Sequence, residues 1–100
     1  MEIESAVKEM FLKTVRNILK DGHYKVFLFG SRCNGRGTER SDYDLGIEAE
    51  NELPAALVRE LKQQLNELPL MQKIDLVDFK SVSKDFSNVA KEKTEVLYEQ

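Results

Sequence analysis

The stretch YKVFLFGSRCNGRGTERSDYDLGI, residues 24–47, decides the fold. Its first six residues are mainly aromatic, β-branched or otherwise apolar, and Gly30 follows them, so residues 24–29 are predicted to form a buried strand. Residues 42–48 alternate carboxylates with larger aromatic or apolar side chains, which favours a second strand half open to solvent. The stretch therefore joins two strands through a loop rich in arginine and glycine.

The remaining sequence predicts helices and further strands around this unit. Apolar residues recur at helical spacing from about residue 3 to residue 20, and Pro54 opens another helix whose leucine stripe runs down to Pro69. Residues 73–79, KIDLVDF, indicate a strand, and residues 96–98 a short edge strand. Between them we expect a last helix, capped by Ser83 or Asp85, that turns three apolar residues inward: Phe86, Val89 and Ala90. These elements predict an α/β (α+β) fold in which a small mixed sheet of about four strands has helices mainly on one face.

Length and composition limit the classes of protein that fit. A chain of 100 residues predicts one domain, 1–100, and 41% hydrophobic with 33% charged residues describes a globular protein. The net charge of −3 provides no general attraction for nucleic acid, so no direct nucleic-acid binding is expected. The N-terminus lacks the pattern of a signal peptide, and no apolar run approaches the ~20 residues that span a bilayer. We therefore expect a cytoplasmic protein.

The turn after the first strand has the residues of an anion site. Gly30 lets the backbone approach a ligand closely, and Ser31 adds a hydroxyl donor. Arginines follow in the same loop, Arg32 among them, and guanidinium groups pair well with phosphate oxygens. A plain glycine turn with solvated arginines is the simpler alternative. The glycine spacing also approaches that of a P-loop, but arginine stands where that motif requires lysine.

Asp42 and Asp44 supply the chemistry of a metal site. Side chains two apart on a strand share a face, with their Cα atoms about 6.5 to 7 Å apart. Two carboxylates held this way repel each other unless a cation lies between them. Oxygen ligands favour Mg²⁺ or Mn²⁺ over zinc. The alternative is a solvated surface turn.

A third carboxylate is expected from the strand at residues 73–79. Asp75 and Asp78 are three apart, so in a regular strand they face opposite sides and only one can join Asp42 and Asp44. Asp75 is the favoured candidate because apolar residues flank it, whereas Asp78 near the strand end is expected to be more easily solvated. The sequence leaves open which of the two is the third acid.

Together, the Gly-Ser pair at 30–31, Asp42-Tyr43-Asp44-Leu45 and the later Ile-Asp-Leu-Val-Asp strand resemble the DNA polymerase β-like nucleotidyltransferases, and most of all their minimal nucleotidyltransferase (MNT) group. The proline that usually precedes the Ser-Asp pair is absent. The resemblance implies that Gly30 and Ser31 hold a triphosphate, that Asp42 and Asp44 ligate two Mg²⁺ ions, and that Asp75 completes the site. Two further residues, Arg32 and Gly35, match the pattern of the closer group.

The same resemblance implies a function and a partner. It implies Mg²⁺-dependent transfer of a nucleoside monophosphate, AMP from ATP being the favoured case, to a hydroxyl of a small helical HEPN-type protein for which this chain is the antitoxin. The alternative is a catalytically weak binding module of the same fold that neutralises or scaffolds its helical partner by complex formation. The acceptor, the base preference and the oligomeric state, homo-oligomer or hetero-oligomer, are left open.

Overall fold

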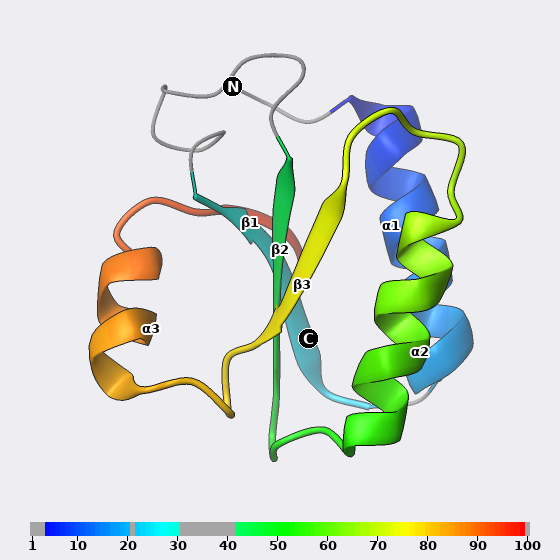
Figure 1. Cartoon of the computed structure of the whole chain (residues 1–100). Helices are drawn as coiled ribbons and strands as arrows, with labels where there is room; N and C mark the ends of the chain where they lie inside the picture. The colour runs from blue at the N-terminus through cyan, green and yellow to red at the C-terminus, as the bar shows by residue number, and fades with distance from the viewer. Residues whose placement is uncertain (1–3, 21, 31–41, 100) are drawn as a thin grey trace.

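The computed structural model describes residues 4–20, 22–30 and 42–99. Within these residues, three helices and four strands follow one another (Figure 1). Their bounds are α1 Ser5–Leu19, β1 Tyr24–Phe29, β2 Tyr43–Ala49, α2 Ala55–Asn66, β3 Ile74–Asp78, α3 Lys84–Ala90 and β4 Glu95–Glu99. Every element predicted from the sequence is present. The second helix, however, ends at Asn66, three residues before Pro69.

The strands form one mixed sheet in the order β3-β2-β1-β4. β1 runs antiparallel to both β2 and β4, whereas β2 and β3 are parallel. The register pairs Phe29 with Asp44 across β1 and β2, and Asp44 with Asp75 across β2 and β3. The acids predicted on two separate strands are therefore neighbours across the sheet, beside the end of β1.

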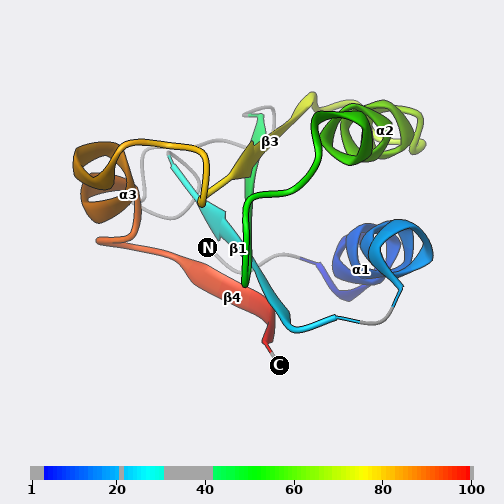
Figure 2. The ribbon, with the colours of Figure 1, turned by 90° about the horizontal axis from the view of Figure 1, so that it is seen from below.

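The principal core lies between the sheet and two of the helices. α1 and α2 lie side by side on one face of the sheet, and α3 lies on the other (Figure 2). The side chains most deeply buried in this core are Phe11, Val15, Val26, Leu45, Ile47, Leu61 and Leu65. Helices thus cover mainly one face, as predicted, and in the described residues no helix is long and apolar enough to cross a membrane.

A smaller aromatic cluster occupies the opposite face. Phe27, Phe29 and Phe79 are buried there, with ring centroids 4.8 Å apart for Phe27 and Phe79 and 5.1 Å apart for Phe29 and Phe79. Gly46 lies beneath this cluster. A Cβ atom at Gly46 would stand 2.6 Å from the Phe27 ring and 2.7 Å from the Phe79 ring, so only glycine allows both rings to rest on the sheet.

α3 packs less closely than the sequence predicts. Ser83 is its cap, since the Ser83 hydroxyl oxygen accepts a hydrogen bond from the Phe86 N–H at 3.1 Å. The inward orientation predicted for its apolar residues is wrong for Val89, which is 68% exposed, and for much of Phe86, which is 44% exposed. The physical reason is length: a helix of seven residues presents only two turns to the sheet, and the aromatic cluster already fills the space beneath it.

Candidate functional site

The end of β1 is built around Gly30. This residue has φ +83°, in the region that favours glycine, and a Cβ atom there would lie 2.9 Å from the Cγ atom of Asp44 and still closer to its Oδ2 atom. Both the backbone conformation and the space therefore require glycine. Gly30 in turn fixes where the Asp44 carboxylate can stand. Three other predicted phosphate-site residues, Ser31, Arg32 and Gly35, lie outside the described residues.

Asp44 is the centre of an acidic group. Partial burial raises the pKa of its carboxyl above the ordinary value, and the negative charges of Asp75 and Asp42 raise it further. Asp42 is exposed and stands directly before β2, and Asp75 is the register partner of Asp44 on β3. The structure thus brings together the three acids that the sequence singled out, and their charges act on one another.

Asp78 has a different role from the one expected. The prediction that it would be easily solvated is wrong: Asp78 is 5% exposed and lies on the opposite side of β3 from Asp75. Its Oδ2 atom accepts a hydrogen bond from the Leu53 N–H at 2.8 Å, and its Oδ1 atom accepts one from the Lys80 N–H at 3.0 Å. Backbone donors satisfy this buried carboxylate, so it connects two loops instead of joining the acidic group.

Asn66, which the sequence analysis did not single out, holds the free edge of β3 next to Asp75. Its Oδ1 atom accepts a hydrogen bond from the Ile74 N–H at 3.0 Å, and its Nδ2 atom donates to the Ile74 carbonyl at 2.9 Å. Nδ2 also donates to the Lys62 carbonyl at 2.9 Å, so the Asn66 side chain links the edge of β3 to α2. An asparagine at a helix end gives no sequence signal of this kind, because its partner is set by tertiary structure.

A pocket of ≈ 600 Å³ opens beside the acids. Asp44 and Asp75 lie in its wall together with Asn66 and the two lysines Lys62 and Lys73. The Lys73 Nζ atom is 3.6 Å from Asp75 Oδ1, and both side chains are substantially exposed, so this ion pair is weak and readily exchanged. The pocket can therefore receive a polar group next to Asp75.

The donor chemistry of the acidic group fits a hard divalent cation. Asp42, Asp44 and Asp75 offer carboxylate oxygens. The pKa of Asp44 is raised first by partial burial and then by the neighbouring negative charges, which a cation would offset. Across residues 4–20, 22–30 and 42–99, no three acidic, histidine or cysteine side chains are grouped tightly enough to hold an ion by themselves. Mg²⁺ commonly takes only one or two protein carboxylates and completes its shell with water and substrate phosphates.

Comparison with known proteins gives consistent matches. A family model described as "Polymerase beta, Nucleotidyltransferase" matches residues 13–100. The "Probable protein adenylyltransferase MntA" of Haemophilus influenzae is 33% identical over 95 residues, which cover 93% of this chain and 83% of that protein.

Solved structures share the fold. A toxin–antitoxin crystal structure with AMP-PNP matches with a TM-score of 0.77 and 26% identity, over 93% of this chain and 73% of that chain. A complex of the tri-AMPylated HEPN toxin of Shewanella oneidensis with its MNT antitoxin gives a TM-score of 0.75 and 22% identity, over 98% of this chain and 74% of that chain. At the latter identity the likeness concerns the fold alone.

Proposed function

The chain belongs to the polymerase β nucleotidyltransferase family, and from this premise we propose that it transfers AMP from ATP to a hydroxyl group of a HEPN-type partner protein, as the antitoxin of that partner. One observation carries the proposal: Gly30 packs against Asp44, and Asp44 is the register partner of Asp75 on the neighbouring strand, beside an open pocket. A phosphate-binding turn and a group of acids then meet at one point. The relative named as a protein adenylyltransferase supports a protein acceptor.

The proposed roles follow from position for Gly30 and the three acids, and from the family pattern for Ser31, Arg32 and Gly35, which lie outside the described residues. Gly30 and Ser31, with Arg32 and Gly35, bind the triphosphate, and Asp42 and Asp44 hold Mg²⁺ with Asp75 as the third ligand. We propose two ions, with Mn²⁺ as the alternative metal. When bound, the metal polarises the phosphate oxygens and neutralises the departing pyrophosphate. The acceptor oxygen bonds to the α-phosphorus as the bond to the bridging oxygen breaks, and Asp75 accepts the hydroxyl proton.

The pocket beside Asp75 is the proposed entrance for the acceptor. It borders Asp75, the acid that would take the proton from the acceptor hydroxyl. The acceptor hydroxyl would therefore arrive from the β3 side, while the donor phosphates lie on the β1 side at Gly30. This arrangement keeps the two substrates on opposite sides of the reacting phosphorus.

Intact-mass spectrometry tests the transfer. The HEPN-type partner, incubated with this protein, ATP and Mg²⁺, should gain the mass of one or more AMP groups. Asp44→Asn and Asp75→Asn should remove that gain, whereas Glu50→Gln, which neutralises an exposed acid just past the other end of β2, should not. An unchanged partner mass with the unmodified protein would contradict AMP transfer.

A second candidate is neutralisation by binding alone. The observation that favours it is the exposed apolar surface of α3, at Phe86 and Val89. In that case the unmodified protein would bind and inhibit its partner without adding mass to it, and Asp44→Asn would bind and inhibit the partner equally well. Size-exclusion chromatography of the mixed proteins, combined with an assay of the partner's own activity, separates the two candidates.

A further inference from the structure

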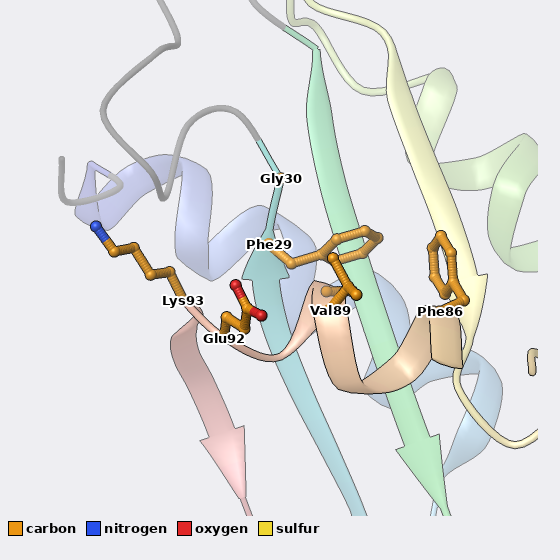
Figure 3. A pocket seen from close by; sticks show the side chains of 7 residues that line it. Phe29, Gly30, Phe86, Val89, Glu92 and Lys93 are labelled. Atoms are coloured by element: carbon orange, nitrogen blue, oxygen red, sulfur yellow. The ribbon is translucent and has the colours of Figure 1, made fainter. Parts of the chain in front are cut away.

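A second pocket borders Gly30. It measures ≈ 440 Å³, and Phe29 and Phe86 line both pockets, so these two rings form the partition between them. Figure 3 shows Phe29, Val89 and Phe86 at one end of the second pocket and Glu92 and Lys93 at the other. This apolar space therefore adjoins the turn to which the donor phosphates are assigned.

Apolar side chains of α3 that are not buried against the sheet line this pocket. Val89 is 68% exposed and Phe86 is 44% exposed, and both side chains line the pocket. The Phe86 ring meets the Phe29 ring edge to face, with centroids 6.3 Å apart and planes at 86°. Apolar and aromatic walls with a few polar groups at one end are typical of small-molecule sites of this size.

We propose that this pocket binds the base of the nucleotide donor, and that a purine base fills it. The proposal rests on the function proposed above. A nucleoside triphosphate has one flat apolar part, its base, and the pocket offers two aromatic rings and one aliphatic side chain for that part to contact. Glu92 can accept a hydrogen bond from an amino or hydroxyl group at the polar end, and Lys93 can donate one.

Continuity with the acidic site favours a base over a docked protein. Gly30 lines this pocket and also packs against Asp44, so phosphates held at that turn would place the attached nucleoside beside either pocket. The pocket of ≈ 600 Å³ is bordered by Asp75, to which the acceptor proton is assigned, and so suits the acceptor. The apolar pocket next to α3 is therefore the better match for the base.

Calorimetric titration of variants with two ligands tests the assignment. Phe86→Ala should weaken binding of Mg-ATP about tenfold, which is within the usual range for a lost base–aromatic contact, and should leave Mg-tripolyphosphate binding unchanged. Val89→Asp, at an exposed position that tolerates polarity, should weaken Mg-ATP binding at least as much. Val96→Ala is the matched control, since Val96 on β4 is also 44% exposed but does not line the pocket.

The outcomes separate this proposal from the proposed function. If the unmodified protein binds neither Mg-ATP nor Mg-tripolyphosphate, the proposed function fails and the base site fails with it. If the unmodified protein binds both, and Phe86→Ala and Val89→Asp bind Mg-ATP as it does, only the base site is overturned. Loss of the partner complex in those variants with unchanged Mg-ATP affinity would also overturn it, by assigning the surface to protein docking.

Discussion

Gly30 and Asp44 constrain each other at the scale of single residues. Gly30→Ala would place a methyl group against the Asp44 carboxylate in a backbone conformation of φ +83°. We expect this variant to lose about 1–2 kcal/mol of unfolding free energy from the backbone conformation alone, and to lose nucleotide binding because Asp44 must move. Urea denaturation and calorimetry with Mg-ATP measure the two effects.

Gly22→Ala is the control for that prediction. Gly22 has no positive φ, and a Cβ atom there would meet only the Tyr24 ring at 3.9 Å, an ordinary contact distance. Both stability and nucleotide binding should therefore remain close to those of the unmodified protein. Equal behaviour of the two alanine variants would contradict the role assigned to Gly30.

Asp44 predicts a pH dependence that can be followed without nucleotide. Burial and the two neighbouring acids raise its pKa in the folded protein, so the folded state binds this proton more tightly than the unfolded chain does. Ionisation of Asp44 therefore costs stability as pH rises from its unfolded pKa of about 3.9 through the raised folded value. In EDTA at pH 7, Asp44→Asn should be more stable than the unmodified protein, by less than about 1 kcal/mol because the site is half-exposed.

Two further measurements test whether the ionised Asp44 carboxylate destabilises the folded protein. The stability difference should vanish as the pH falls below about 3, where the unmodified carboxyl is protonated in both states. Mg²⁺ should raise the melting temperature of the unmodified protein and have a smaller effect on Asp44→Asn. An Asp44→Asn variant that is less stable in EDTA at neutral pH would show that the carboxylate is stabilised by contacts other than a metal.

At the scale of elements, β3 separates the acid that we propose to be reactive, Asp75, from a structural one, Asp78. Asp75→Asn should leave stability nearly unchanged, because the Asp75 side chain is 46% exposed and its ion pair with Lys73 is weak, yet it should abolish transfer. Asp78→Asn should cost about 1–3 kcal/mol, because one of the backbone donors that the carboxylate satisfies would face an amide N–H₂ group. Thermal melts and the AMP-transfer assay should show opposite patterns for the two variants.

Asn66 is predicted to position Asp75 through the backbone of β3. Asn66→Ala removes both hydrogen bonds to Ile74, so we expect a loss of about 1–2 kcal/mol and a fall in kcat that exceeds any change in KM for ATP. Gln64→Ala is the matched control on the same helix, since its side-chain amide donates a hydrogen bond to the exposed Glu60 carboxylate at 3.3 Å. A kcat unaffected by Asn66→Ala would reduce its role to stability.

The elements themselves could be predicted from sequence because their periodicity is local. The buried β1 and the leucine stripe of α2 are clear examples. What could not be predicted depends on contacts between elements. The exposure of Val89 follows from the aromatic cluster beneath α3, and the burial of Asp78 follows from the Leu53 backbone, 25 residues away in the chain. Asp42, Asp44 and Asp75 could be proposed as a site from residue type and spacing, whereas nothing in the sequence indicates the hydrogen bonds of Asn66 to β3.

At the scale of the whole molecule, the sheet has two unequal faces. One face carries the large core beneath α1 and α2, and the other carries three phenylalanines partly covered by α3 (Figure 2). The lightly covered face is the one next to the acids and both pockets, since Phe29 lines each of them. The large core and the proposed ligand sites thus lie on opposite faces of the sheet.

Gly46 is the residue on which this division can be tested. Gly46→Ala would insert a methyl group 2.6 Å from the Phe27 ring and 2.7 Å from the Phe79 ring, so the aromatic cluster must shift outward. Overpacking of this kind costs about 1–3 kcal/mol, which for a domain of this size lowers the melting temperature by roughly 4–8 °C per kcal/mol. Because Phe79 contacts Phe86, with ring centroids 5.9 Å apart, the shift should also reach the apolar pocket and weaken Mg-ATP binding. A variant that melts lower but binds Mg-ATP unchanged would show that the cluster and the pocket are mechanically independent.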